Sequence, residues 1–192
     1  MTESAERTDR VCLVMGLVLG EKIAIFGCGG SGKSTLARQL GAVTGLPVIH
    51  LDQEYWQPGW TEPPHDEWVE TMSRLISGKA WIIDGNYSGT GFEERLAAAD
   101  TLIFLDISRY VCIFSVIQRW LSNLGRTRPD MAPGCPEKID LEFLQWIWSF
   151  PRRSRPKIIA ALAHYGDADG TGVFVLRTRK QIRGFIQKTE EN

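Results

Sequence analysis

The chain has 192 residues, of which 43% are hydrophobic and 23% are charged. This length predicts one domain of ordinary size, and the hydrophobic fraction is sufficient for a single core. The net charge of −1 argues against a protein that binds nucleic acid or a membrane surface mainly through its overall charge.

The first 21 residues are expected to form an N-terminal extension. Their apolar run over 11–19 is too short to span a bilayer, follows several charged residues and precedes no small-residue cleavage site. An extra edge strand or a ragged extension is therefore expected rather than a signal peptide. The four cysteines are Cys12, Cys28, Cys112 and Cys135. They form no C-x-x-C pair and lie in no histidine cluster, which predicts reduced thiols in a cytoplasmic protein rather than zinc ligands or disulfides.

Residues 27–34 match the phosphate-binding loop motif G-x-x-x-x-G-K-[ST] without a mismatch. An apolar strand is expected over 22–26 and a helix over 35–40, and a helix start of this kind binds phosphate through free backbone N–H groups. The residues predicted to bind ATP are Gly27, Gly29, Gly30, Ser31, Gly32, Lys33, Ser34 and Thr35. Lys33 is expected to reach the β- and γ-phosphates, and the Ser34 hydroxyl to bind Mg²⁺. A glycine-rich turn that binds nothing is the alternative, but eight positions and both flanks agree with the motif.

Apolar runs and helical patterns alternate along the rest of the chain. Strands are expected at 47–52, 81–84, 101–106 and 173–176, helices at 66–77, 108–125, 139–150, 154–165 and 180–188, and loops at 53–65 and 126–137. This alternation predicts an α/β, three-layer P-loop NTPase fold, in which a parallel sheet of about five strands carries helices on both faces. Residues 22–192 are expected to form one P-loop kinase-like domain.

Three of the expected strands run into an aspartate, and parallel strands bring their carboxyl ends to one edge of the sheet. Asp52 would there face a second substrate beside the γ-phosphate, where a carboxylate can hold or deprotonate an attacking hydroxyl. A turn cap is the alternative role for Asp52. Asp84 is predicted to support Mg²⁺, and Asp106 is a competing candidate because it follows the same kind of apolar run.

Arginines gather in the second half of the chain, at positions 119, 126, 128, 152, 153 and 155. Phosphoryl transfer needs positive charge on the migrating group in a dry site, and arginines on a closing lid supply both. The predicted catalytic arginines are Arg119, Arg126 and Arg128, and the predicted substrate-binding arginines are Arg152 and Arg155. The lid is expected over about 120–137. For any single arginine, a solvated basic face is the alternative.

Aromatic residues lie near the expected acceptor site. The other predicted substrate contacts are Tyr55, Trp56, Asn86 and Tyr87. The aromatic members of this set, together with Trp60, could stack on a ring-shaped substrate or pack among themselves. Trp68, Trp146 and Trp148 lie on apolar helical faces and are predicted to be buried.

Several motifs together resemble a known family. They are the phosphate loop, Leu51-Asp52 with Tyr55-Trp56, Pro58-Gly59-Trp60, the segment 81–87, Arg128-Pro129-Asp130, Gly134-Cys135-Pro136-Glu137 and the segment 148–156. Spread over about residues 22–188, they resemble the bacterial DNA topology modulation protein family, which is similar to adenylate kinases. The Asp84-Gly85 step is also similar to that of adenylate kinases, where the aspartate acts near Mg²⁺ and a following arginine holds the acceptor phosphate. Here Asn86 and Tyr87 follow instead, and Ser115 stands where such kinases often carry an arginine one turn before the one that Arg119 matches.

Together these features predict an adenylate-kinase-like enzyme that transfers the γ-phosphoryl group of Mg²⁺–ATP to a nucleoside, a nucleotide or another small hydroxyl compound. A nucleotide-binding regulator with little turnover, whose family name implies an effect on DNA topology, and a direct DNA binder are the alternatives. The expected lid and Asp52 favour the kinase, and the net charge disfavours stable nucleic-acid binding. No membrane association is expected, and the sequence leaves the acceptor and the oligomeric state open.

Overall fold

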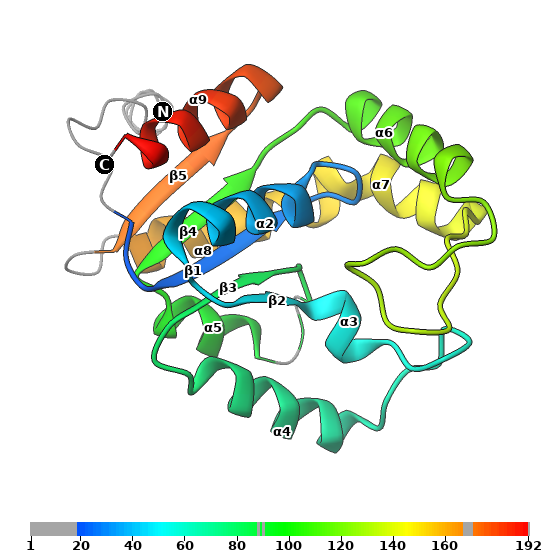
Figure 1. Cartoon of the computed structure of the whole chain (residues 1–192), viewed down its shortest axis with the longest axis horizontal. Coiled ribbons are helices and arrows are strands. Elements are labelled where there is room, and N and C mark those ends of the chain that lie inside the picture. Colours follow the sequence, from blue (N-terminus) through cyan, green and yellow to red (C-terminus); the bar gives the residue numbers. More distant parts are fainter. Residues whose placement is uncertain (1–18, 88, 90, 167–170, 192) are drawn as a thin grey trace.

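A parallel sheet of five strands forms the centre of the molecule (Figure 1). A computed structural model describes residues 19–87, 89, 91–166 and 171–191 of the chain. The strands are β1 (Lys22–Gly27), β2 (Val48–His50), β3 (Trp81–Asp84), β4 (Thr101–Leu105) and β5 (Gly172–Leu176), and they lie in the order β2-β3-β1-β4-β5. The predicted α/β fold is confirmed. β2 is shorter than predicted, because a helix begins at Leu51.

β1 is the central strand, and its apolar residues 23–26 are fully buried. Both of its neighbours are parallel, and Ile25 lies in register with Asp84 on one side and Ile103 on the other. His50 of β2 lies in register with Asp84. The ends of β2 and β3 therefore bring a histidine and an aspartate side by side at the carboxyl edge of the sheet.

Helices cover both faces of the sheet. α2 (Lys33–Thr44) and α9 (Arg179–Glu190) pack together on one face, and α5 (Phe92–Ala98) and α8 (Arg155–Gly166) pack together on the other (Figure 1). The remaining described helices are α3 (Leu51–Tyr55), α4 (His65–Ile76), α6 (Arg109–Ser122) and α7 (Leu141–Arg153). The sequence did not predict α3 or α5, which have only five and seven residues and are too short for a clear helical period.

Residues 126–137, here called the arginine loop, dock on the segment 56–61 at the carboxyl edge of the sheet. Gly59 donates its N–H to the Gly134 carbonyl (3.0 Å), and the Trp60 indole donates to the Pro136 carbonyl (3.2 Å). A small second core of Met131, Ala132 and Cys135 is buried here, with Trp56 and Trp60 packed against it. A loop is confirmed, but it is anchored by apolar side chains that the sequence pattern did not reveal.

The chain enters the sheet at the edge opposite the arginine loop, where the N–H of Gly20 donates to the hydroxyl of Thr101 (3.0 Å). The predicted edge strand over 11–19 lies outside the described residues except for Leu19. Within the described part of the chain, no helix has the length and apolar character that crossing a membrane requires.

The three tryptophans that were predicted to be buried differ in their surroundings. Trp68 of α4 is buried, but Trp146 and Trp148 of α7 are 36% and 49% exposed. The prediction is wrong for these two because α7 is apolar over a wider arc than its neighbours α6 and α8 cover.

Candidate functional site

The phosphate loop joins β1 to α2 in a backbone shape that glycine allows. Gly30 and Gly32 have φ values of 77° and 99°, in the left-handed region. A Cβ at Gly30 would also collide with the carbonyl oxygen of Cys112, and one at Gly32 with the guanidinium of Arg179. Among the described residues no side chain caps the start of α2, and its first turn holds no acid, so its N–H groups can donate hydrogen bonds to a bound anion.

Two side chains from distant parts of the chain hold this loop. The Asn86 amide accepts a hydrogen bond from the N–H of Gly27 (3.1 Å) and donates one to its carbonyl (2.8 Å). Arg179 donates to the carbonyls of Ser31 (2.7 Å) and Gly30 (3.0 Å). Asn86 was predicted to contact substrate, but its amide is engaged with the loop backbone on both sides. Arg179 was missed, although its position just past β5 places it at the active edge of the sheet.

Lys33 and a pair of thiols complete the loop. The Lys33 ammonium donates to the carbonyl of Cys28 (3.2 Å), across the mouth of the loop. The thiol of Cys28 forms a hydrogen bond with that of Cys112 on α6, and this contact together with burial raises the pKa of Cys28. Both thiols are buried, and their contact links the loop to α6.

Asp84 ends β3 directly beside Ser34. The Ser34 hydroxyl donates to Oδ2 of Asp84 (2.8 Å), and the His50 ring is hydrogen-bonded to Oδ1. A serine hydroxyl and a carboxylate are hard oxygen ligands of the kind that Mg²⁺ prefers, so this pair fits the ion. The competing candidate Asp106 instead binds Arg155 through both of its oxygens, each at 2.8 Å. Of the two aspartates, Asp84 is thus the one that the fold places at the phosphate loop.

A buried arginine supports the turn that follows Asp84. Arg95 of α5 is fully buried and donates to the carbonyls of Gly85 (3.1 Å) and Asn86 (2.7 Å). Its guanidinium lies 4.9 Å from the centre of the Phe26 ring. Burial lowers the pKa of Arg95 to about 9, while the charge of Asp84 opposes this shift. The side chain is therefore still charged at neutral pH. No local sequence pattern pointed to Arg95, because α5 itself was not predicted.

Asp52 is the second residue of α3 and lies half-buried near the phosphate loop. The Tyr87 hydroxyl donates to its Oδ1 (2.9 Å). Burial raises the pKa of Asp52, and the charge of Asp84 adds to this; the charge of Lys33 and the hydrogen bond from Tyr87 oppose it. Tyr87 itself has a φ of 36°, a strained backbone position of the kind found at functional sites.

The predicted aromatic residues form a cluster beside Asp52. The Tyr55 ring lies 4.7 Å from that of Tyr87, 4.9 Å from Trp68 and 5.1 Å from Trp56, measured between ring centres. The rings pack edge-on or tilted against one another. This agrees with the alternative in which these residues pack among themselves. The cluster forms an apolar wall on one side of the Asp52 carboxylate.

Two of the predicted catalytic arginines are paired with acids of the arginine loop. Arg119 donates to Glu137 (2.8 Å), and Arg128 binds both Asp130 (2.7 Å) and Glu137 (2.5 Å). Both acids are buried. The side chain of the third predicted arginine, Arg126, is exposed. Asp130 and Glu137 were missed as site residues, because a charge pair between segments leaves no local pattern.

Asp130 is the residue through which the arginine loop approaches the phosphate loop. Burial alone would raise the pKa of Asp130, but the charge of Arg128, the nearby Ser34 hydroxyl and the charge of Arg38 together lower it. Arg38 of α2 lies 3.6 Å from the same carboxylate. The Ser34 hydroxyl therefore has carboxylates on two sides, Asp84 from the sheet and Asp130 from the arginine loop.

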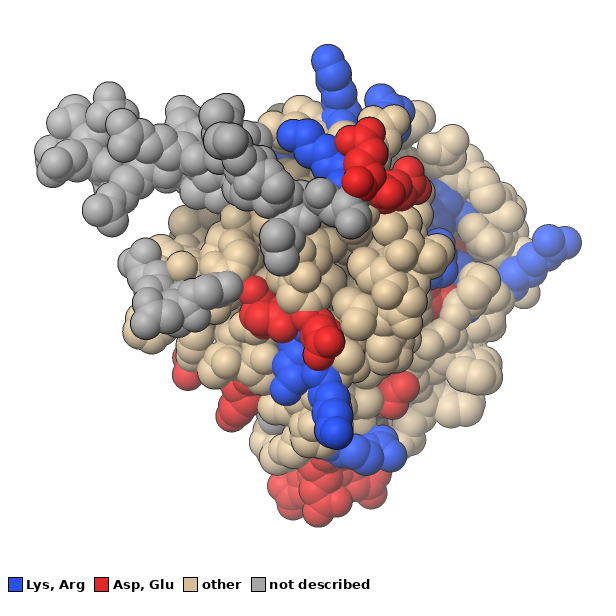
Figure 2. Space-filling view, turned by 60° about the vertical axis from the view of Figure 1, so that its left-hand side comes forward, with Lys and Arg blue, Asp and Glu red and all other residues tan. Residues whose placement is uncertain are grey.

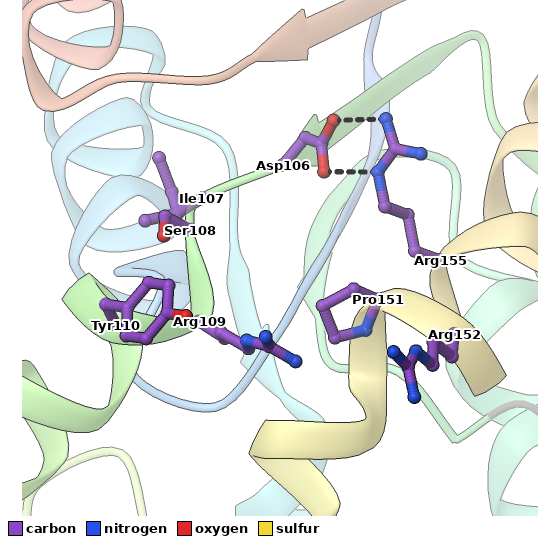
Figure 3. A pocket seen from close by; sticks show the side chains of 8 residues that line it. All are labelled: Asp106, Ile107, Ser108, Arg109, Tyr110, Pro151, Arg152 and Arg155. Carbon is purple, nitrogen blue, oxygen red and sulfur yellow. Dashed lines mark hydrogen bonds and ion pairs between the residues drawn. The ribbon is translucent and has the colours of Figure 1, made fainter.

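The two predicted substrate arginines lie elsewhere, in a pocket of about 370 Å³ at the end of β4 (Figure 3). Its lining residues are Asp106, Ile107, Ser108, Arg109, Tyr110, Pro151, Arg152 and Arg155. Figure 3 shows Arg155 turned toward Asp106, with Arg152 on the far side of Pro151. The lining shares no residue with the phosphate loop, Asp52 or Asp84. The predicted site residues therefore lie in two separate places, one around the phosphate loop and one in this pocket.

Comparison with known proteins gives the fold. No family model matches the sequence, and no curated protein matches it. A solved shikimate kinase from Acinetobacter baumannii, in complex with shikimate, aligns with a TM-score of 0.53 over 86% of this chain and 88% of that one, at 16% identity. The chain shares the α/β fold of this shikimate kinase.

Two further solved kinases align with TM-scores below 0.5. A gluconokinase from Sinorhizobium meliloti gives a TM-score of 0.49 at 13% identity, covering 88% of this chain and 89% of that one. A deoxyadenosine kinase from M. mycoides with bound dATP gives 0.45 at 17% identity, covering 87% and 98%. At these identities the likeness concerns the fold, and the chemistry has to be argued from this chain's own residues.

Proposed function

We propose that this protein is a kinase that transfers the γ-phosphoryl group of Mg²⁺–ATP to a hydroxyl group of a small molecule. The observation that supports it most is the half-buried Asp52, with a raised pKa, within electrostatic reach of Lys33 and Asp84. Its Oδ1 accepts a hydrogen bond from Tyr87, and no described residue is bonded to Oδ2, which leaves Oδ2 to meet an acceptor hydroxyl. A carboxylate in this place orients the hydroxyl and takes its proton as the new phosphate ester bond forms.

The phosphate loop supplies the other half of this chemistry. The N–H groups at the start of α2 and the Lys33 ammonium hold the phosphates, and Ser34 with Asp84 would hold the metal. Mg²⁺–ATP, when bound, supplies the phosphoryl group and spreads positive charge over the β- and γ-phosphate oxygens. Asn86, Arg179 and Arg95 position these groups through the backbone and do not touch the reacting atoms.

The acids around the site favour an uncharged hydroxyl acceptor over a monophosphate. A phosphate acceptor would bring negative charge toward Asp52, Asp84 and Asp130, and like charges at close range destabilise each other. Adenylate-kinase-like specificity and membership of the topology modulation family are weaker proposals, supported by motif resemblance alone.

An acceptor screen that follows ADP formation tests the proposal. Nucleosides and sugar-like hydroxyl compounds should raise ADP formation above the background hydrolysis of ATP, and nucleoside monophosphates should not. Turnover of a monophosphate with the hydroxyl compounds inactive would contradict the hydroxyl-acceptor proposal.

A nucleotide-binding regulator is the second candidate. The pairing of Arg119 and Arg128 with Glu137 and Asp130 supports it, because these arginines are already neutralised without a ligand. A regulator would bind Mg²⁺–ATP, and no compound in the panel would raise ADP formation. The change in shape on binding, rather than turnover, would then be the function.

We also propose that the protein does not bind nucleic acid stably and that it is cytoplasmic. Basic and acidic side chains are interspersed on the face drawn in Figure 2, and the net charge is −1. Stable binding draws on the neutralisation of many phosphates by a basic surface. Tight and steeply salt-dependent binding to duplex DNA, in the absence of ATP, would contradict the first of these proposals.

A further inference from the structure

The outer side of α6 carries large apolar side chains that are exposed. Among the described residues, every strongly exposed large apolar side chain except Val69 lies between residues 110 and 148. Five of them form a stripe that runs the length of α6 and just past its end: Tyr110, Phe114, Ile117, Leu121 and Leu124. They are exposed by 41–67%. The opposite side of α6 already buries Cys112 and Val116 in the core, so the helix is apolar on two sides.

The spacing of the stripe is that of a helix-pairing seam. Its members follow one another at intervals of 4, 3, 4 and 3 residues, which is the a/d pattern by which two helices pack along their length. None of the five is charged. A single helix gains nothing from this pattern in water, so the pattern indicates a partner helix.

α7 adds apolar side chains to this surface and holds one of them in a fixed position. A groove of about 330 Å³ runs between the two helices, lined by Ile113, Leu141, Leu144, Gln145 and Trp148. Arg109 at the start of α6 donates to the carbonyl of Trp148 (3.2 Å), and its guanidinium lies 3.9 Å from the centre of the indole ring. The exposed Trp148 is thus held in place rather than free to fold inward.

We propose that this surface, called the α6 seam, joins two copies of the chain in a symmetric dimer. A two-fold axis near Ile117 would pair α6 with its copy in antiparallel fashion. Tyr110 would then face Leu124 of the second copy, and Phe114 would face Leu121. Each aromatic side chain meets a leucine and no charges oppose one another, so the stripe is complementary to itself.

The exposed area supports a stable contact. A fully exposed aromatic side chain offers about 150–250 Å², so Tyr110, Phe114 and Trp148, exposed by 63%, 67% and 49%, offer roughly 350 Å² together. Four aliphatic side chains, Ile117, Leu121, Leu124 and Leu141, add to this. The sum approaches the ~800 Å² that each partner buries in an interface of standard size.

The N-terminal extension is the other candidate occupant. It would start from Gly20, which is tied to Thr101 at the first residue of β4, whereas α6 follows the other end of that strand. An extension that covered the seam would leave the wild-type chain a monomer at every concentration.

Measurement of the molecular mass of the full-length chain tests the proposal, by light scattering and by sedimentation over a range of concentrations. The wild-type chain should have the mass of a dimer. The double variant Phe114→Glu with Leu121→Glu should dissociate at least about 100-fold more readily, because it buries charge at the centre of the contact. Val69→Glu, at an exposed apolar site on α4, is the matched control and should remain a dimer. A wild-type monomer at every concentration, or a dimer that the double variant leaves intact, would overturn the proposal.

Cross-linking keeps the test decisive if the double variant does not fold. Ile117→Cys, in a Cys12→Ser background, places a thiol beside its own copy at the two-fold axis, and mild oxidation should join the two chains. The described native cysteines are buried. Val69→Cys in the same background should stay unjoined. Equal cross-linking at both positions, or none at 117, would contradict the antiparallel seam.

Discussion

The phosphate loop and the arginine loop lie at the same edge of the sheet but are held by different forces. Asn86 and Arg179 fix the phosphate loop through hydrogen bonds to its backbone. The arginine loop is held by charge pairs between side chains, such as Arg128 with Glu137. Phosphate oxygens can replace a carboxylate on an arginine, but they cannot replace the paired donor and acceptor that Asn86 offers to the Gly27 backbone. The first loop is therefore a fixed template, and the second can exchange its partners when an anionic ligand binds.

The largest expected effect on activity comes from a change in the phosphate loop. Lys33→Ala removes the ammonium group that faces the mouth of the phosphate loop. The loss of transition-state stabilisation should be about 3 kcal/mol or more, which lowers the rate of ATP use at least about 100-fold. Lys79→Ala, at an exposed position after α4, is the control. A wild-type rate for Lys33→Ala would show that the loop does not serve phosphoryl transfer.

Asp52→Asn probes the space between the two loops. It should lower kcat by roughly 100-fold, the scale of general-base loss, with ATP affinity nearly unchanged. Full kcat in this variant, together with losses in Arg126→Ala and Arg128→Ala, would instead point to a monophosphate acceptor held by the arginines.

The pH profile gives Asp52 a second test. A protonated carboxyl cannot take a proton, so the rate should rise with pH as Asp52 ionises. Burial raises the pKa of Asp52, so this rise should lie above the range of an ordinary aspartate. Tyr87→Phe removes a hydrogen bond that lowers this pKa and should move the rise to higher pH. Asp52→Asn should abolish it, and a rise that persists in that variant belongs to another group.

A smaller effect is expected from Asn86→Ala. The variant leaves the N–H and the carbonyl of Gly27 without their partners, which should lower the free energy of unfolding by about 1–3 kcal/mol and weaken ATP binding. Denaturant unfolding and nucleotide titration measure the two effects. Asn123→Ala is the matched control, since its side chain donates a single bond, to the carbonyl of Arg119. Equal losses in both variants would mean that the phosphate loop does not depend on Asn86.

The smallest effect concerns the arginine loop. A non-hydrolysable ATP analogue with Mg²⁺ should increase the protection of residues 126–137 from hydrogen exchange, because phosphates would tether Arg119 and Arg128 to the phosphate loop. β1 is already buried at the centre of the sheet and should change little. Equal protection of the arginine loop in the free and bound states would contradict the expected exchange of ion-pair partners by Arg119 and Arg128. It would also contradict the predicted lid.

The features of this molecule that could be predicted are those that depend on residues adjacent in the sequence. The strands and the glycine-rich turn between β1 and α2 follow from short runs of sequence, which is why they were placed correctly apart from the end of β2. The choice between Asp84 and Asp106 needed the positions of Ser34 and Arg155, and those depend on how the strands pair. Helical period placed Trp148 on an apolar face, but it carries no information on whether another element covers that face.

The distance along the chain between Arg179 and the loop it holds has a consequence for biosynthesis. The carbonyls of Gly30 and Ser31 are synthesised 149 and 148 residues before Arg179. A nascent chain can form β1 and α2 long before their anchor exists, and the same guanidinium also reaches Ser115 of α6. The nucleotide site is thus completed only after Arg179 has left the ribosome, so nascent chains that end before Arg179 should not hold ATP as the finished protein does.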